Sequence, residues 1–394
     1  MPDSSTVDSV PGPLNGVRVL ECASIVLGPM TGQLLGDMGA DVIKVEPPEG
    51  DLTRRIGPSV EDKMGALFLG CNRNKRSVVL DLKTAVGQAN LARLAASSDV
   101  VLCSIRPRSA ERIGLGYDAL SAVNDRLIYC QLEGFGETGP YAGKPAYDDI
   151  VQALSGLAML QSVVTREPRY VPSIVADKIT GVHAAYAIAL ALFHRERTGQ
   201  GQKISMAMFE TLAAFNLVEH LWGHALEPAI APLGYPPVVT AARRPFATKD
   251  GYMAVMPYTD EDWRRFYQVS GRVDLLDDPR YSTLAGRQQN VGLVWDGLGD
   301  EIAKRTSAEW VELLETTDIP FSVVNSLGDL LTDPHLERVG FWRRLTDGDR
   351  TYRFPASPIG LTASPPSLRR RPPRLGEHTD EILRELSTSE AGAR

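Results

Sequence analysis

The sequence lacks the short signatures of several common enzyme classes. Its 394 residues contain no HExxH segment of a zinc protease and no GxSxG segment of a serine hydrolase. They contain no GxxxxGK[ST] phosphate loop either, and Gly114 and Gly116 are not followed by the third glycine of a dinucleotide fingerprint. His220 and His224 lie four residues apart on a predicted helix, but no third ligand accompanies them. We therefore expect neither a metal site nor a bound cofactor.

Cysteine is scarce, positive charge is not in excess, and long apolar runs are missing. The four cysteines, Cys22, Cys71, Cys103 and Cys130, include no CxxC pair, which is typical of free thiols in a reducing cytoplasm. The formal charge of −7, from 42 Lys and Arg against 49 Asp and Glu, gives no support for nucleic-acid binding. No uninterrupted apolar run is long enough to span a bilayer. These features predict a cytoplasmic protein without a nucleic-acid or membrane partner.

The sequence does contain enough apolar residues for two globular domains. With 43% hydrophobic residues, a chain of 394 is too long for one ordinary core. Residues 1–13 have neither the basic start nor the apolar centre of a signal peptide, so we expect a disordered lead-in. The stretch 226–247 is rich in proline and poor in charge, which predicts a linker. A smaller α+β domain beyond it is predicted from helical patterns near 260–269, 284–305 and 307–316.

Strand and helix patterns alternate through the first half of the chain. Apolar or β-branched runs predict strands at Val17–Glu21, Asp41–Val45, Ser77–Asp81, Asp99–Cys103 and Leu127–Gln131. Such alternation is typical of α/β proteins with a doubly wound parallel sheet. Ligands of these sheets bind outside the carboxyl ends of the strands, so we look for a site there.

Asp177 stands at the start of a long amphipathic helix, predicted for residues 177–197. A carboxylate in this position commonly serves as an N-cap for the free backbone N–H groups of the first turn. The positive end of the helix is expected to lower the pKa of Asp177 and keep the side chain ionised. An ionised carboxylate can also attack a thioester carbonyl, and the same N–H groups can stabilise the resulting oxyanion. Cap and nucleophile are compatible roles.

Basic residues gather next to the predicted strands. Asn72–Arg76 precedes the strand Ser77–Asp81, and Lys83 follows it. Ser104–Arg108 lies just past the next predicted strand, with Arg112 one helical turn further on. Cations at strand ends suit the phosphates of a nucleotide-like ligand, and an arginine plane can stack on an adenine. The alternative is that these are solvated surface charges, which is the usual position of Arg and Lys.

An ordered set of short segments resembles the class III CoA-transferases, the CaiB/BaiF family of formyl-CoA, carnitine and bile-acid CoA-transferases. The segments follow one another in the order typical of the family, from about Leu14 to Leu386. They are Leu14–Glu21, Gly28–Pro29, Gly39–Glu46, Gly50–Arg54, Asn74–Lys83, Gly136–Tyr141, Tyr147–Gln152, Thr198–Gln202 and Leu375–Asp380. Each segment alone is weakly specific, whereas the ordered set is strongly specific.

The resemblance implies a role for each matched residue. Asp177 falls on the family's nucleophile, and Asp148 falls on an acidic active-site residue of formyl-CoA transferase, which implies a supporting acid. The family's contacts to CoA fall on Val26, Leu27, Leu80, Asp81, Leu82, Lys83, Ser104, Ile105, Arg106 and Arg112. Formyl-CoA transferase has glutamine in place of Val26, and its glycine-rich loop has no clear counterpart in 226–250. These departures favour an acyl group larger or less polar than formyl or oxalyl.

The resemblance also implies the architecture and the reaction. A Rossmann-like large CoA-binding domain is expected over 14–225, a small domain with its linker over 226–330, and over 331–394 a return segment that completes the large domain. The family forms interlaced homodimers. The implied reaction moves CoA from an acyl-CoA to a carboxylic acid through an aspartyl anhydride and an aspartyl-CoA thioester. CoA is then a substrate, and no metal or other cofactor takes part.

Two other functions remain open on the sequence. The 2-methylacyl-CoA racemases belong to the same family and use a His and an Asp as bases on either side of the α-carbon. Their His falls on Tyr147, and a tyrosine is a poor base at neutral pH because its ordinary pKa is about 10. The other alternative is a CoA-binding partner subunit without catalysis, against which the presence of Asp177 argues. Transferase is favoured over both.

Overall fold

The computed structural model describes residues 10–59 and 61–392, in two compact units. Of the lead-in expected over residues 1–13, residues 1–9 lie outside the described residues. The second unit interrupts the first in the sequence. The first comprises Met1–Gln161, Pro168–Val218 and Glu337–Arg394, and the second comprises Ser162–Glu167 and Glu219–Leu336.

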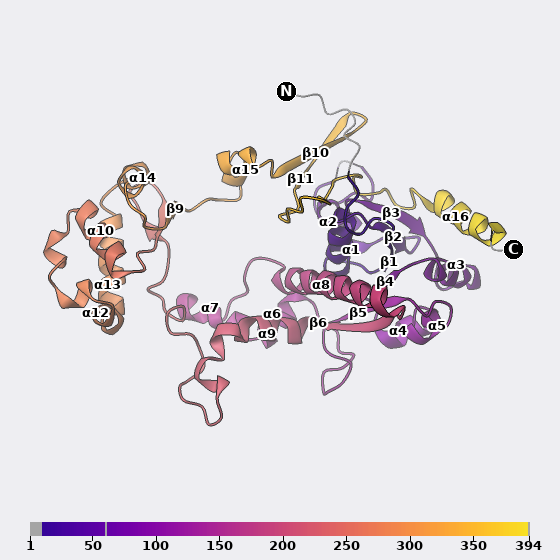
Figure 1. The fold of residues 1–394 in the computed structure, drawn as a ribbon, viewed down its shortest axis with the longest axis horizontal. Coiled ribbons are helices and arrows are strands. Elements are labelled where there is room, and N and C mark those ends of the chain that lie inside the picture. Colours follow the sequence, from indigo (N-terminus) through magenta and orange to yellow (C-terminus); the bar gives the residue numbers. More distant parts are fainter. Residues whose placement is uncertain (1–9, 60, 393–394) are drawn as a thin grey trace. The chain divides into compact units, whose positions relative to one another are not determined.

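Six parallel strands form the sheet of the first unit (Figure 1). Their order across the sheet is β3 (Lys75–Val79), β2 (Asp41–Glu46), β1 (Arg18–Cys22), β4 (Val100–Cys103), β5 (Ile128–Glu133) and β6 (Gln202–Ala207). The chain starts in the middle, winds outward to β3 and returns to β4 on the other side of β1. The winding direction reverses between β1 and β4, and the crevice outside their carboxyl ends is the usual ligand position. The α/β fold with a doubly wound parallel sheet is confirmed.

Helices cover both faces of this sheet. One face carries α1 (Leu27–Asp37) and α8 (Val175–Thr198), and the other carries α3 (Ala85–Ala96) and α16 (Thr379–Gly392). Alternate residues of each strand point to opposite faces. Val19 and Val42 therefore belong to the core under α1 and α8, whereas Leu20 and Ile43 belong to the core under α3 and α16.

Helix α8 is the only helix of the described residues that is long and apolar enough to cross a membrane, by length and composition alone. It packs along β5, β6 and α1. Asp177 and Arg195 are buried within it, and Arg195 pairs with Asp99 at 2.9 Å. One face of α8 therefore packs in the core of the first unit.

Shorter helices form most of the other connections of the sheet. They are η1 (Leu52–Arg55), α2 (Ala66–Cys71), α4 (Pro107–Arg112), α5 (Tyr117–Ser121), α6 (Asp148–Leu154), α7 (Leu157–Thr165) and α9 (Met208–His220). The helical pattern of residues 148–158 does not form a single helix. It is divided into α6 and α7 because Gly156 between them has a φ of +85°, which is outside the α-helical region.

The C-terminal segment belongs to the first unit and completes its edge. It forms the hairpin β10 (Trp342–Asp347) and β11 (Arg350–Pro355), and ends in α16. Just before and at the start of α16 the chain runs along β3. The N–H of His378 donates to the Ser77 carbonyl at 3.0 Å, and the N–H of Val79 donates to Thr379 Oγ1 at 3.1 Å. Because β3 is an edge strand, the tail occupies backbone groups that otherwise invite pairing with another chain.

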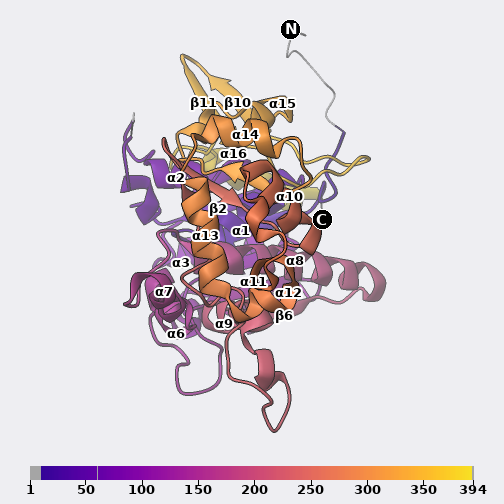
Figure 2. The same cartoon turned by 90° about the vertical axis from the view of Figure 1, so that its left-hand side faces the viewer.

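The second unit is a small α+β domain (Figure 2). Its antiparallel sheet consists of β7 (Phe246–Ala247), β8 (Tyr252–Val255) and β9 (Phe321–Val323). Its core contains the aromatic residues Trp263, Phe266 and Trp310. Five helices surround this core: α10 (Asp260–Ser270), α11 (Pro279–Ser282), α12 (Leu284–Gln289), α13 (Val291–Ile302) and α14 (Ser307–Leu314). Short turns η2 (Trp222–Ala225), η3 (Val273–Leu275) and η4 (Asp329–Leu331) and the helix α15 (Pro334–Arg338) accompany them. The single helix predicted over 284–305 is divided at Asn290, whose φ of −121° is not helical.

Candidate active site

Asp177 is not the cap of its helix. Helix α8 begins at Val175, two residues earlier than predicted, and its N-cap Ile174 makes no side-chain hydrogen bond. The free N–H groups of Ala176 and Asp177 donate instead to Asp148 Oδ1, at 2.7 and 3.3 Å. Asp148 is the first residue of α6 and thus caps α8 from another helix. The prediction of an Asp177 cap is wrong because a carboxylate 29 residues earlier in the chain takes that role.

Asp148 is itself held by a neighbour on α6. Gln152 Nε2 donates to Asp148 Oδ2 at 2.6 Å and to the Ser173 carbonyl at 3.2 Å. Gln152 Oε1 accepts the N–H of Val171 at 2.9 Å. One buried amide therefore links α6 to the segment that leads into α8. This linkage fixes Asp148 and, through it, the first turn that carries Asp177.

The Asp177 carboxyl is 9% exposed, and its environment opposes ionisation. Burial and the nearby Asp148 charge raise its pKa to about 6, against the lowering effect of a hydrogen bond from the Leu27 backbone N–H. The prediction that the helix end lowers this pKa is wrong, because Asp148 occupies the N–H groups and burial dominates. At pH 7 the side chain is still ionised, by roughly ten to one. It is a poorly solvated carboxylate in a position to react.

The N-terminus of α1 faces the Asp177 side chain. Leu27, the first residue of α1, donates its backbone N–H to the Asp177 carboxylate, and Val26 before it is the N-cap. The two helices approach closely at Gly181, where a Cβ atom would lie 3.2 Å from the Leu27 carbonyl oxygen. Thr31 Oγ1 donates to the Gly181 carbonyl at 3.2 Å. The structure thus brings two of the sequence-predicted contacts, Val26 and Leu27, next to Asp177.

A cavity of about 390 Å³ lies at the carboxyl ends of β1 and β2. Five of the residues predicted to contact CoA line it, namely Leu80, Asp81, Leu82, Lys83 and Ile105. Asp81 Oδ1 accepts the N–H of Lys83 at 3.0 Å, which shapes the turn after β3. The remaining wall comes from Cys22–Ser24, Lys44–Leu52 and Ile113. Sequence reasoning missed Lys44 and Asp51 in this wall, because a charged residue in or after a short strand gives no signal of burial.

Arg106 and Arg112 line a different hollow, of about 810 Å³, on the other side of the same loop. Both arginines are exposed, and Arg112 donates to Ser109 Oγ at 3.1 Å. Ile105 and Ile113, their neighbours in sequence, line the first cavity. Ser104 Oγ accepts the N–H of Ser24 at 3.2 Å, so it joins the loops after β4 and β1. Seven of the ten predicted contacts therefore line two hollows that flank α4, whereas Val26, Leu27 and Ser104 line neither.

The basic segment before β3 does not take part in either hollow. β3 starts at Lys75, so Asn72–Arg76 lies at the amino end of the strand, opposite the ligand edge. Its charges are paired inside the protein: Arg73 with Asp37 at 2.6 Å and Arg76 with Asp41 at 2.6 Å. The suggestion that this segment suits a phosphate is wrong for this reason.

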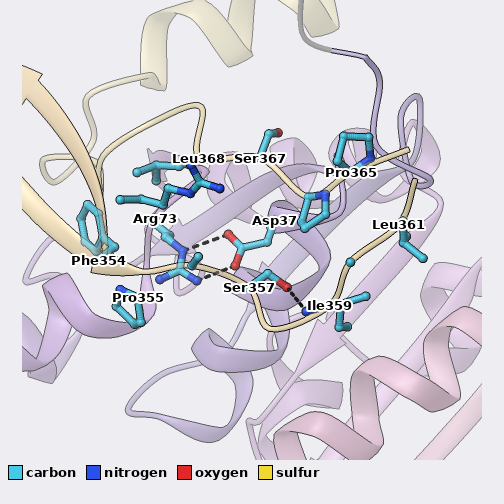
Figure 3. A pocket seen from close by; sticks show the side chains of 14 residues that line it. Asp37, Arg73, Phe354, Pro355, Ser357, Ile359, Leu361, Pro365, Ser367 and Leu368 are labelled. Atoms are coloured by element: carbon cyan, nitrogen blue, oxygen red, sulfur yellow. Dashed lines mark hydrogen bonds and ion pairs between the residues drawn. The ribbon is translucent and has the colours of Figure 1, made fainter. Parts of the chain in front are cut away.

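A third hollow, of about 220 Å³, is built around the Arg73–Asp37 pair and the segment after β11 (Figure 3). It contains none of the residues predicted for the site. The described residues contain no group of three or more His, Cys, Asp or Glu placed to hold a metal ion. Of the histidine pair, His220 Nδ1 accepts the N–H of Tyr235 at 3.2 Å, which is a structural contact.

One glycine pattern escaped the sequence analysis. Gly134–Gly139 has the GxGxxG spacing and follows β5. No helix begins there, however, and the chain runs through bends and turns until α6 at Asp148. A dinucleotide fingerprint needs the N-terminus of a helix directly after the glycines. The segment therefore gives no support for such a cofactor.

Comparison with known proteins gives consistent matches along the chain. Residues 14–379 match the sequence model described as CoA-transferase family III. A succinate–glutarate CoA-transferase of Agrobacterium fabrum is 35% identical over 397 residues, covering 97% of each chain. A probable fatty acyl-CoA transferase of Mycobacterium tuberculosis, Rv3272, is 32% identical over 94% of this chain and 97% of that protein. The crystal structure of a CaiB/BaiF family protein from Brucella suis superposes with a TM-score of 0.84 at 33% identity, covering 95% of this chain and 100% of that one.

Proposed function

The chain belongs to CoA-transferase family III and is an enzyme of the CoA-transferase type, and from this premise we propose that Asp177 carries CoA between a donor acyl-CoA and an acceptor carboxylic acid. The observation that carries the proposal is the Asp177 carboxylate itself. It is buried at the start of α8, with a pKa raised to about 6 by burial and by Asp148. It is thus ionised at neutral pH and carries little solvent to shed before it reacts.

The proposed reaction has four acyl exchanges, two with the donor and two with the acceptor. The Asp177 carboxylate attacks the thioester carbonyl, which expels CoA thiolate and leaves an aspartyl–acyl anhydride. The thiolate then attacks the aspartyl carbonyl of the anhydride, which releases the donor acid as a carboxylate and leaves an aspartyl-CoA thioester. The acceptor carboxylate reverses both steps, so that the acceptor leaves as acyl-CoA and Asp177 is restored. Each step exchanges one acyl bond for another, and dividing the transfer in this way is covalent catalysis.

Asp148 and Leu27 assist by position. Asp148 fixes the first turn of α8, and its negative charge opposes the ionised form of Asp177. Anhydride formation moves that charge onto the departing thiolate, so the repulsion is relieved during the first step. The Leu27 N–H holds one face of the Asp177 carboxylate and restricts its rotation. These contacts give Asp148 a positioning role rather than that of a proton donor.

The cavity of about 390 Å³ at the strand ends is the place we assign to part of the CoA, with Lys83 at its rim. For the transferred acyl groups we propose short dicarboxylates. The support is the Agrobacterium relative, named for succinate and glutarate and 35% identical over 97% of both chains. A fatty acyl group, after the name of the Mycobacterium relative, is the competing class, and Val26 in place of a glutamine is compatible with it.

Racemisation remains a weaker candidate. It requires a base on each side of the substrate α-carbon. The only residue matched to the second base is Tyr147, whose side chain is 69% exposed at the N-cap of α6. Transfer requires nothing of Tyr147, and the structure is therefore more compatible with transfer.

We also propose that the enzyme acts as a homodimer in the cytoplasm. Helix α8 leaves an apolar stripe with half or more of each side chain exposed, at Val182, Tyr186, Leu190 and Phe193. Such a stripe is typical of a surface that another chain covers. Light scattering behind a sizing column gives the mass directly, and a monomer at micromolar concentration would contradict the dimer.

Because the aspartyl-CoA thioester conserves the free energy of the donor, the transfer is expected to need neither ATP nor a metal.

The test of the reaction is chemical trapping. Purified protein is incubated with a panel of acyl-CoAs, including succinyl-CoA, glutaryl-CoA and a long-chain acyl-CoA, in the presence of hydroxylamine. Hydroxylamine converts an activated aspartyl group to a hydroxamate, which peptide mass spectrometry assigns to a residue. We expect the hydroxamate at Asp177, strongest with the dicarboxylyl-CoAs. A hydroxamate elsewhere, or no modification with any member of the panel, would contradict the proposal.

A further inference from the structure

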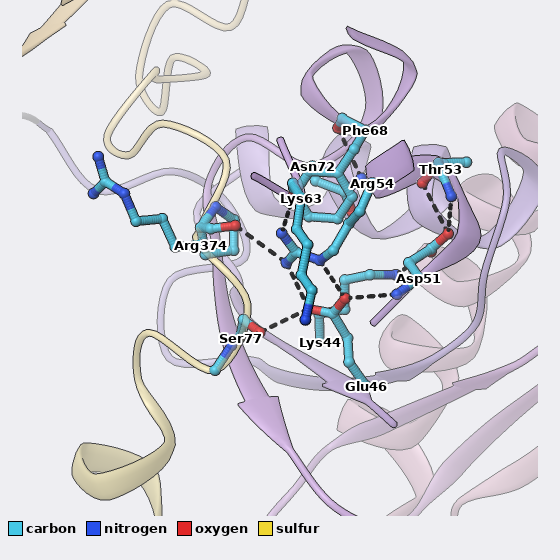
Figure 4. Close-up of polar contacts among 12 residues, drawn as sticks. Lys44, Glu46, Asp51, Thr53, Arg54, Lys63, Phe68, Asn72, Ser77 and Arg374 are labelled. Atoms are coloured by element: carbon cyan, nitrogen blue, oxygen red, sulfur yellow. Dashed lines mark hydrogen bonds and ion pairs between the residues drawn. The ribbon is translucent and has the colours of Figure 1, made fainter. Parts of the chain in front are cut away.

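Four charged side chains are fully buried beside the turn that leads from β1 into α1. We call them the charge cluster: Glu21, Lys44, Asp51 and Lys75. Lys44 Nζ lies 2.9 Å from Asp51 Oδ2 (Figure 4). It also lies 3.0 Å from Glu21 Oε1. Lys75 Nζ lies 2.7 Å from Glu21 Oε2. The cluster is neutral as a whole, with two positive and two negative groups.

Burying the four side chains of the charge cluster costs free energy, because charged groups lose their contact with water. Moving ions out of water costs more than their attraction usually returns, and apolar side chains of similar size are often as stable or more so. The protein also shapes a helix around it. A Cβ atom at Gly32 of α1 would lie 2.0 Å from Glu21 Oε2. Stability alone is therefore a poor explanation, and a positional role is the better one.

Three members of the charge cluster hold the backbone of Ala23–Pro29, which we call the entry turn. Lys44 Nζ donates to the Ala23 carbonyl at 2.8 Å, and Lys75 Nζ donates to the Pro29 carbonyl at 2.7 Å. Asp51 Oδ1 accepts the N–H of Ile25 at 3.4 Å. The entry turn is thus bound at its beginning, middle and end by side chains from outside it.

The middle of the entry turn is strained. Ile25 has a φ of +71°, a conformation that a β-branched residue rarely adopts. Strain of this kind persists only where surrounding contacts impose it. Two residues later, the N–H of Leu27 donates to the Asp177 carboxylate. The direction of that N–H is set by the strained turn.

We propose that the charge cluster positions the entry turn so that the Leu27 N–H meets the Asp177 carboxylate, which makes Lys44 and Lys75 positioning residues for the reaction. This inference rests on the proposed function of Asp177 as the nucleophile. Lys44 and Lys75 do not touch the Asp177 carboxylate; they act through the backbone between Ala23 and Pro29. Without them the turn relaxes, the hydrogen bond to Asp177 is lost, and the carboxylate is free to rotate.

Two charge-balanced double variants test the role without leaving a buried ion unpaired. Lys44→Met with Asp51→Asn keeps the Glu21–Lys75 pair, and Lys75→Met with Glu21→Gln keeps the Lys44–Asp51 pair. The matched control is Arg73→Met with Asp37→Asn, which removes a buried pair at the other end of α1 that does not touch the entry turn (Figure 3). Thermal unfolding shows which variants are folded, and one folded double variant is enough to test the positioning role.

The first readout needs no transfer activity. The side-chain carboxyl of Asp177 is followed by NMR across pH in protein labelled with carbon-13 at the aspartate carboxyls, with Asp177→Asn to assign the signal. Asp148 is the charged group against Asp177 and is retained in all variants. We expect the titration midpoint of Asp177 to rise by about one pH unit in the double variants, because a hydrogen bond to the charged form is lost. The control is expected to keep the wild-type midpoint.

The second readout is kinetic. We expect kcat to fall about a hundredfold in both double variants. The Kd for CoA should stay within about threefold of wild type in Lys75→Met with Glu21→Gln, whose residues do not line the cavity assigned to CoA. A midpoint equal to that of the control, or a defect of this second variant confined to CoA affinity, would overturn the positioning role. If wild type transfers CoA to no acid, the proposed function fails, and the NMR midpoint still decides whether the charge cluster acts on Asp177.

Discussion

Asp148 accepts the backbone N–H of Asp177 at 3.3 Å, while its charge raises the pKa of the Asp177 carboxyl. The Asp148 carboxylate therefore caps the start of α8, and the Asp177 carboxylate remains available to react. Because the cap comes from α6, Asp177 is not bound by the N–H groups of its own first turn. The lone pairs of a capping carboxylate are engaged in hydrogen bonds. Because Asp177 does not cap its helix, its lone pairs are more available for nucleophilic attack.

Substitution of Asp177 should abolish transfer without unfolding the protein. We expect Asp177→Ala and the isosteric Asp177→Asn to lower kcat by at least about a thousandfold, because no other group restores the covalent intermediate. Affinity for CoA, measured by calorimetry, is expected to stay within about threefold. Activity of either variant above roughly a thousandth of wild type would contradict the covalent role.

Asp148 should matter more to the stability of the fold than Asp177. Asp148→Ala removes the acceptor for two N–H groups at the start of α8 and is expected to cost about 1–2 kcal/mol. Asp177→Ala removes no cap. Urea denaturation of the two variants at pH 7 gives the comparison, with Asp149→Ala, the exposed next residue, as the control. A larger loss in Asp177→Ala than in Asp148→Ala would show that the cap is misassigned.

The rate should follow the ionisation of Asp177. With a pKa raised to about 6, kcat/KM is expected to fall tenfold per pH unit below that value, since only the carboxylate attacks. Asp148→Asn keeps an acceptor for the helix N–H groups and removes the charge, so it should move this limb to lower pH. The measurement is a set of pH–rate profiles with one acyl-CoA. A limb that stays in place in Asp148→Asn would rule out this electrostatic coupling.

Stability should respond to pH in the opposite sense to that of an ion-paired carboxylate. The folded-state pKa of Asp177, about 6, lies above the unfolded value, so its contribution to stability falls as pH rises from about 4 to about 6. Above pH 6 the ionised side chain costs up to about 3 kcal/mol. Asp177→Asn should therefore gain melting temperature over wild type at pH 7.5 and gain less at pH 5. An equal difference at both pH values would refute the shifted pKa.

Lys83, Arg106 and Arg112 should affect CoA affinity more than turnover at saturation. They line the two hollows that flank α4, away from Asp177 in the sequence and on other elements. Loss of one charge-assisted contact is expected to cost roughly 1.5–3 kcal/mol of binding, seen as a higher KM for acyl-CoA. Arg384→Ala, an exposed cation on α16, serves as the control. An unchanged KM in all three alanine variants would show that these residues are ordinary surface charges.

The strands could be predicted because burial on both faces makes them continuous apolar runs. Val19 and Leu20 point to opposite faces and are both fully buried, and the sequence shows them as adjacent apolar residues. Helix bounds were less predictable. Gly156 ends one helix and separates it from the next by a single positive φ, while the residues on either side keep a helical spacing.

The candidate site was predictable only where a residue matched the family pattern. Asp177, Val26 and Leu27 come together as expected, but the pKa of Asp177 depends on Asp148, which is remote in sequence. Lys44 and Lys75 were beyond sequence reasoning for a different reason. A lysine is nearly always exposed, and the burial of these two depends on a carboxylate, Glu21, supplied by another strand of the sheet. Pairing of this kind is a property of the folded sheet.

The contact between the C-terminal tail and β3 has a consequence for biosynthesis. Gly376, His378 and Thr379 bind the outer edge of a strand made of residues 75–79, and the whole second unit is translated between them. A ribosome must therefore deliver the whole second unit before that edge is covered. Until then the nascent sheet presents an open strand to its surroundings. Folding of the first unit thus waits for residues 376–379, and a chain that stops at the end of the second unit keeps an edge prone to aggregation.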